Sequence, residues 1–137
     1  MDDVRTLEVP PDLAQLAPVR RFAATAADDL GAEVDRSDLA LVIGELVANA
    51  ILHGQAPVRL EISSTADHGL AISVHDGGAE LPQVIRGAPW DATGHRGMVL
   101  VDALTTGWGV ELEPGGKRVW AQLAPAGVSP RSGARPG

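Results

Sequence analysis

LALVIGELVANAILHG, residues Leu39–Gly54, is a nearly uninterrupted apolar segment around which the other elements are arranged. Three polar side chains stand in it at four-residue intervals, Glu45, Asn49 and His53. Each four-residue step advances about 40° around a helix, so these three side chains form one slanted stripe. A separate aliphatic face lies roughly 90–150° away from the stripe, and it consists of Leu39, Ile43, Leu46, Val47 and Ala50. The segment therefore predicts a helix with one side for a core and another side for chemistry.

The composition is typical of one globular domain that is short of aromatic residues. Of 137 residues, 45% are hydrophobic and only 3% are aromatic, so the core is expected to be aliphatic. The absence of cysteine excludes disulfides and thiolate metal sites, and it is compatible with a reducing cytoplasm. The net charge of −7 argues against nucleic acid as the main partner, although backbone N–H groups can still form a local anion site.

The chain shows neither a targeting segment nor a membrane span. The first residues, MDDVRTLEVP, lack the basic and apolar regions of a signal peptide. No apolar run reaches the roughly 18–20 residues that a bilayer requires. A cytoplasmic protein without membrane contact is therefore expected.

Hydrophobic periodicity predicts the elements on either side of the central helix. Further helices are expected over Leu13–Leu30 and Met98–Leu104. Strands are expected over Val4–Val9, Pro57–Ser63, Leu70–His75, Trp108–Leu112 and Arg118–Leu123. This order favours an α+β two-layer sandwich, with helices on one face of a mixed, largely antiparallel sheet. Residues 1–124 would form the domain, and the Pro-, Gly- and Arg-rich residues 125–137 a disordered tail.

The polar stripe is the first place that could carry chemistry. A carboxylate and an amide one turn apart, as Glu45 and Asn49 are, can serve a hydrated Mg²⁺, and the carboxylate can also act as a base. The alternative is that Glu45 and His53 are ordinary solvated side chains, with His53 doing no more than ending the helix. Asparagine has a low helix propensity, so its presence at position 49 between alanines indicates a role other than helix formation.

The strands Pro57–Ser63 and Leu70–His75, with the polar turn Asp67–Gly69 between them, are expected to form an antiparallel hairpin. Two glycine-containing segments follow this hairpin. Asp76, at the end of a strand, can accept a hydrogen bond from an exocyclic amine such as that of adenine, and the glycines after it allow close approach of the backbone. The alternative there is a plain Asp-Gly turn. The segment Gly94–Gly97 would open a helix with free N–H groups, which favours an anion, whereas the alternative is a flexible linker. The aperiodic chain between Asp76 and Gly97 is typical of a lid or binding loop.

In this order and spacing, the motifs resemble those of the GHKL family of ATP-binding domains, which have the Bergerat, histidine kinase-like ATPase fold. The segment ELVANAILHG resembles their N box, VHDGGAELP their G1 box and GHRGMVLV their G2 box. The later segments VDAL, WGV and GKRVWAQL are similar to those of the single-domain bacterial anti-sigma factor serine kinases and their actinobacterial ATP-binding relatives. The resemblance covers about residues 5–124.

The resemblance implies roles for individual residues. By position, Glu45 matches the general base and Asn49 the Mg²⁺ ligand, so ATP and Mg²⁺ are the expected cofactors. The implied ATP-binding residues are Asn49, His53, Asp76, Gly78, Leu81, Gly94, Arg96, Gly97 and Met98. The implied activity is that of a serine/threonine protein kinase, which phosphorylates an anti-anti-sigma (STAS-type) partner and sequesters a sigma factor.

Two positions depart from the family pattern. Glu80 stands where the G1 box has its second glycine, and Arg118 takes a position often held by threonine. A second hypothesis is therefore a non-catalytic regulatory protein of the same fold that binds partners, with weak or structural nucleotide binding. A histidine-kinase catalytic domain is disfavoured, because no helix with a phospho-accepting histidine precedes the domain. The aliphatic strand faces would permit a homodimer.

Overall fold

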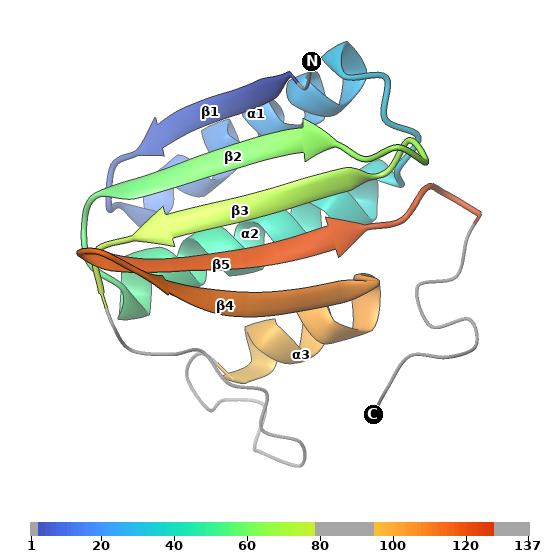
Figure 1. Cartoon of the computed structure of the whole chain (residues 1–137). Helices are drawn as coiled ribbons and strands as arrows, with labels where there is room; N and C mark the ends of the chain where they lie inside the picture. The colour runs from blue at the N-terminus through green and yellow to red at the C-terminus, as the bar shows by residue number, and fades with distance from the viewer. Residues whose placement is uncertain (1–2, 79–94, 128–137) are drawn as a thin grey trace.

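The computed structural model describes residues 3–78 and 95–127, and residues 95–97 by their backbone alone. In these residues, three helices lie on one face of a five-stranded sheet (Figure 1). The helices are α1 (Leu16–Asp29), which follows a 3₁₀ turn at Leu13–Gln15, α2 (Arg36–His53) and α3 (His95–Leu104). The strands are β1 (Val4–Val9), β2 (Val58–Ser64), β3 (Leu70–Asp76), β4 (Gly107–Glu113) and β5 (Gly116–Leu123). The α+β two-layer fold class expected from the sequence is confirmed.

The sheet has the strand order β1-β2-β3-β5-β4, with β1 and β4 at its edges. Its four pairings are all antiparallel, whereas the sequence favoured a mixed sheet that is only largely antiparallel. The predicted β2–β3 hairpin turns at Asp67–Gly69, and a second hairpin joins β4 to β5. Strand β3 pairs with β5 across a long intervening segment, so this central pairing is set by tertiary structure rather than by a turn.

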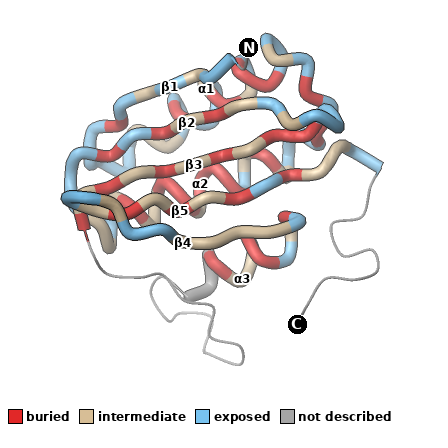
Figure 2. Tube along the Cα trace, in the orientation of Figure 1, coloured by how far each residue is buried: buried red, intermediate tan, exposed pale blue. Residues whose placement is uncertain are grey.

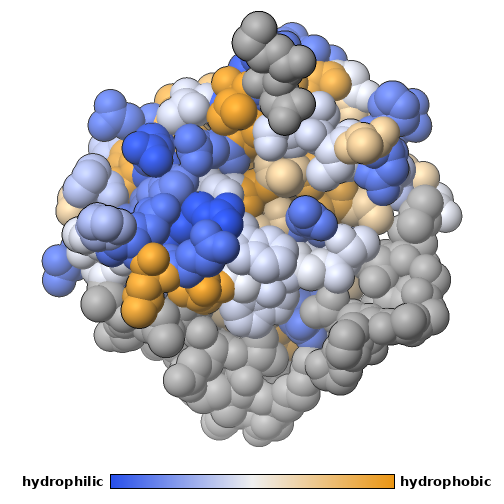
Figure 3. Space-filling view, viewed as in Figure 1, coloured by the Kyte–Doolittle hydropathy of each residue, from blue (hydrophilic) through white to orange (hydrophobic). Residues whose placement is uncertain are grey.

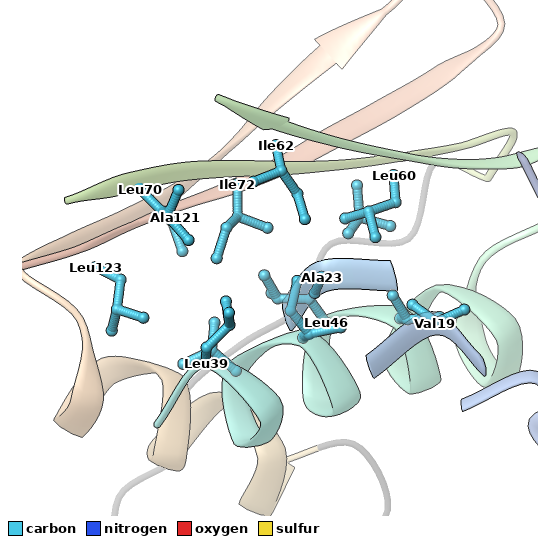
Figure 4. Packing of buried hydrophobic residues seen from close by; sticks show 14 of the residues in the cluster. Val19, Ala23, Leu39, Leu46, Leu60, Ile62, Leu70, Ile72, Ala121 and Leu123 are labelled. Atoms are coloured by element: carbon cyan, nitrogen blue, oxygen red, sulfur yellow. The ribbon is translucent and has the colours of Figure 1, made fainter. Parts of the chain in front are cut away.

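The core lies between the helices and one face of the sheet. Every second residue of the central strands is buried, as the alternating burial along β2, β3 and β5 shows (Figure 2). These side chains meet the buried faces of α1 and α2 (Figure 4). Burial of each large aliphatic side chain contributes about 1.5–3 kcal/mol, and this burial holds the two layers together. The fully or almost fully buried residues include Val19, Leu39, Leu46, Leu60, Ile62, Leu70 and Ile72.

Helix α2 runs through the centre of this core. All five residues of its predicted aliphatic face are buried, so the assignment of that face is confirmed. The helix begins one turn earlier than Leu39, because the Asp35 carboxylate caps it by accepting a hydrogen bond from the Asp38 N–H (2.9 Å). It ends at His53, and Gly54 follows with extended backbone (φ −94°). Gly54 is therefore the C-cap of this helix, with a φ that any residue can adopt.

Among the described residues, no helix covers the opposite face of the sheet, and hydrophilic side chains gather at the left of this face in Figure 3. His75 lies there between the carboxylates of Glu61 (2.6 Å) and Glu113 (2.8 Å). Arg118 contacts Glu111 (2.7 Å) on the same face. The aliphatic faces of the strands are buried under the helices, and the homodimer stays a prediction. Within the described residues, no helix is both long and apolar enough to cross a bilayer.

Candidate functional site

Three chain segments meet at one end of the two-layer sandwich. Strand β3 ends there, β5 begins there, and the C-terminal end of α2 lies beside them, at the left in Figure 1. The register of the β3–β5 pairing places Asp76 directly opposite Lys117. Both side chains point to the helix side of the sheet, because Val74 and Val119, two residues away on each strand, are buried in the core. The end of the core therefore carries a carboxylate and an ammonium group.

The Asp76 carboxylate is held by two donors on one of its oxygens. Its Oδ1 accepts hydrogen bonds from the Gly78 N–H (2.7 Å) and from the Lys117 Nζ (2.9 Å). The two charged side chains are 1% and 4% exposed, respectively. The other oxygen, Oδ2, is buried and has no hydrogen-bond partner among the described residues. Because a buried acceptor without a partner is unfavourable, Oδ2 is the atom at which a donor from a ligand would be stabilised.

Glycines pack closely around this carboxylate. A Cβ at Gly54 would lie 2.5 Å from the Asp76 Cγ, and one at Gly78 would lie 3.2 Å from the Asp76 Oδ1. A Cβ at Gly116 would overlap the Asp76 carbonyl oxygen. The Gly77 N–H also donates to the Gln55 carbonyl oxygen (2.6 Å), which ties the end of β3 to the segment after α2. The missing side chains thus allow helix, strand and carboxylate to approach one another.

We expect Gly54→Ala to displace the Asp76 carboxylate and to abolish a rise in melting temperature (Tm) caused by ATP. The added Cβ would also lie 2.6 Å from the Ala50 carbonyl oxygen, so both the helix end and a buried side chain would have to shift, at a cost of about 1–3 kcal/mol. Differential scanning fluorimetry with and without ATP and Mg²⁺ measures both effects.

Gly31→Ala is the matched control for this variant. Gly31 has a positive φ of 69° and open space around it, so the variant costs about 1–2 kcal/mol through backbone strain alone. Its ATP-dependent rise in Tm should remain. If both variants keep that rise equally, the close packing at Gly54 does not position a nucleotide-binding group.

The polar stripe of α2 leads away from this end of the sandwich. Glu45, Asn49 and His53 are all partly buried. The Asn49 Nδ2 lies 3.7 Å from the Met98 Sδ of α3, and the His53 Nε2 is buried with no hydrogen-bond partner among the described residues. Glu45 precedes Gly54 by nine residues, which is about 14 Å along a helix. The stripe therefore spans a length that an extended nucleotide could follow from base to terminal phosphate.

The remaining predicted site residues lie at or beyond the limits of the described chain. Leu81 and Gly94, together with the departure at Glu80, lie outside the described residues. Arg96 and Gly97 are in the first turn of α3, which begins at His95, so the expectation that Gly97 opens the helix is wrong by one turn or less. Met98 is fully buried and contacts Asn49. The first turn of α3 is thus brought against the stripe on α2.

Lys117 was missed by reasoning from the sequence. It stands within the segment GKRVWAQL, and its signal in the sequence is its place at the start of an alternating strand. The WGV segment also has a structural role, because the Trp108 Nε1 donates to the Asp102 Oδ1 (3.1 Å) and so connects β4 to α3.

Comparison with known proteins assigns the chain to a family. The model of the histidine kinase-like ATPase domain matches residues 9–123. Comparison with curated proteins gave no significant match. A solved structure, the RsbU and RsbW domains of Rv1364c from Mycobacterium tuberculosis, superposes with a TM-score of 0.63 at 18% identity. The match covers 89% of this chain, which spans 32% of that one.

A second solved structure is the histidine kinase domain of a blue-light activated histidine kinase from Erythrobacter litoralis. It has a TM-score of 0.46 at 20% identity, over 86% of this chain and 67% of that one. At these identities the likeness to the Rv1364c domains supports the fold, and the family match rests on nearly the whole described domain. The chain therefore belongs to the histidine kinase-like ATPase family, and this membership implies that it binds ATP.

Proposed function

We propose that this protein is an ATP-dependent serine/threonine protein kinase of the anti-sigma factor type. It would transfer the γ-phosphoryl group of ATP to a serine of an anti-anti-sigma (STAS-type) partner and would hold a sigma factor inactive. The single observation that carries the nucleotide part is the buried Asp76 carboxylate, whose Oδ2 has no partner among the described residues.

The base of the nucleotide fits this carboxylate. The exocyclic amine of adenine would donate a hydrogen bond to the Asp76 Oδ2 and satisfy it. Oδ1 is already occupied by Gly78 and Lys117, so the carboxylate is oriented before a ligand arrives. The absence of side chains at Gly54 and Gly78 lets the backbone pack directly against this carboxylate, which holds it in place.

The phosphates would lie along α2 toward Glu45. Asn49 is the proposed Mg²⁺ ligand through its amide oxygen, since its nitrogen contacts Met98. The described residues hold no cluster of three or more His, Cys, Asp or Glu side chains suited to a metal. Mg²⁺ that is shared with substrate phosphates requires only one or two protein ligands, so a single amide is compatible with it. The bound ion would neutralise phosphate charge during transfer.

In the transfer step, the partner's serine oxygen forms a bond to the γ-phosphorus while the bond between that phosphorus and the β,γ-bridging oxygen breaks. ADP leaves with the electron pair of the broken bond. Glu45 accepts the proton of the serine hydroxyl, as a general base at the far end of the stripe. The described side chains offer its carboxylate no hydrogen bond or ion pair, which leaves it available for this role.

The partners are proposed from the sequence motifs of the anti-sigma factor kinases, from VDAL to GKRVWAQL. The likeness to a structure that includes an RsbW domain is consistent with this proposal at the level of fold. The second candidate function is a regulatory protein that binds partners without transferring phosphate. The negative charge of Glu80 in the G1 motif favours it, since an acid near the nucleotide would repel phosphates.

Two measurements on the full chain separate these functions. Saturating ATP with Mg²⁺ should raise Tm by several degrees, because a ligand at 100 times its Kd stabilises by about 2.7 kcal/mol. Incubation with γ-labelled ATP and a STAS-type protein should then label a serine of that protein. A rise in Tm without labelling of any STAS-type protein tested would favour the regulatory protein, and no rise would contradict both kinase activity and ATP binding.

A further inference from the structure

The ion pair between Asp76 and Lys117 is more deeply buried than stability alone explains. The Nζ–Oδ1 distance is 2.9 Å, and both side chains are at least 96% buried at the end of the core. Removing two charges from water is so unfavourable that a buried pair adds little net stability compared with apolar residues of the same size. A buried pair at a ligand site therefore suggests a role in what the site binds.

The role follows from the protonation state of the carboxylate. An ionised carboxylate only accepts hydrogen bonds, whereas a protonated carboxyl group both donates and accepts. A buried carboxyl group without a nearby cation tends to take up a proton and become neutral. Lys117 supplies such a cation, with its Nζ 2.9 Å from the Asp76 Oδ1, while Oδ2 has no donor among the described residues.

We infer that Lys117 is a specificity-determining residue of the purine subsite. Through its ion pair with Asp76, it makes this site prefer a base that carries an amine over a base that carries a carbonyl group at the same position. This inference rests on the proposed ATP site and deepens it. Adenine presents an amine that donates to Oδ2. Hypoxanthine and guanine present a carbonyl oxygen there, which an ionised carboxylate repels and to which a protonated carboxyl group would donate a hydrogen bond.

Lys117 acts here through Asp76 rather than by touching the base. It lies on β5 directly opposite Asp76, and Arg118, the next residue, points to the other face of the sheet, where it contacts Ser73 and Glu111. Substitution of Lys117 therefore removes the positive charge at the site, whereas substitution of Arg118 tests the general effect of removing a cation from β5.

The test measures the Kd values of ATP and of inosine triphosphate (ITP), which carries a carbonyl group in place of the amine, by isothermal titration calorimetry with Mg²⁺. Wild-type protein should bind ATP about 10- to 100-fold more tightly than ITP. Arg118→Met should keep that ratio. Lys117→Met should bring the two Kd values to within about threefold of each other, chiefly because ITP binds more tightly.

If Lys117 had only a structural role, its substitution would weaken the binding of ATP and ITP alike and leave the ratio of their Kd values unchanged. Lys117→Gln keeps a hydrogen-bond donor without the positive charge, and it decides the question if Lys117→Met does not fold; its ratio should also fall. An unchanged ratio in the folded Lys117 variants would overturn this inference while leaving ATP binding in place. Absence of ATP binding in the wild-type protein would instead overturn the proposed function.

Discussion

Asp76→Asn should abolish the ATP-dependent rise in Tm and should also lower the Tm of the protein without ligand. The amide retains one acceptor, which Gly78 and Lys117 already occupy in the native carboxylate. Its nitrogen would then face the amine of adenine, donor against donor. The substitution also leaves the buried Lys117 ammonium without a counter-charge, which costs about 3–5 kcal/mol. Scanning fluorimetry with and without saturating ATP measures both losses.

The double variant Asp76→Asn/Lys117→Met separates the two losses. It removes the uncompensated charge, so part of the lost stability of the free protein should return. ATP binding should not return, because no acceptor-only group faces the base. Recovery of the ATP-dependent rise in the double variant, or its persistence in Asp76→Asn, would place the base of the nucleotide somewhere other than at Asp76.

The local order of the fold is predictable from the sequence because periodicity and capping report it directly. The aliphatic face of α2 is recognisable from three- and four-residue spacing. Strands β2 and β3 follow from strict alternation, and their turn from Asp67–Gly69. Element ends shift by one to three residues, since a cap or a strand pairing extends the regular backbone beyond the apolar pattern.

The details of the site depend on tertiary pairing, which the sequence does not express. Lys117 is 41 residues from Asp76, and only the β3–β5 register places it opposite that carboxylate. The contact between Asn49 and Met98 depends in the same way on how α3 packs against α2. The place of Asp76 at the end of β3 was predictable, because an acid before glycines at the end of an alternating segment has a recognisable chemistry. The roles of Asp76, Glu45, Asn49 and His53 stay predictions.

Glu45→Gln should nearly abolish phosphoryl transfer to the STAS-type protein while sparing ATP binding. Glu45 lies about 14 Å along α2 from Gly54, which packs against Asp76, so removal of its charge leaves the base subsite intact. The amide cannot accept the proton of the serine hydroxyl. Loss of a general base lowers the rate by about 10²- to 10⁴-fold. Initial rates with γ-labelled ATP, beside the ATP-dependent change in Tm, measure the two properties independently.

Glu8→Gln is the matched control, since Glu8 is exposed on the edge strand β1 and makes the same change of charge outside the site. It should leave both transfer and the rise in Tm unchanged. Transfer that persists in Glu45→Gln would remove this residue from the role of base. Loss of the ATP-dependent rise together with transfer would show instead that the carboxylate helps to bind the phosphates and their metal, because a base that acts only in the transfer step contributes nothing to the binding of ATP.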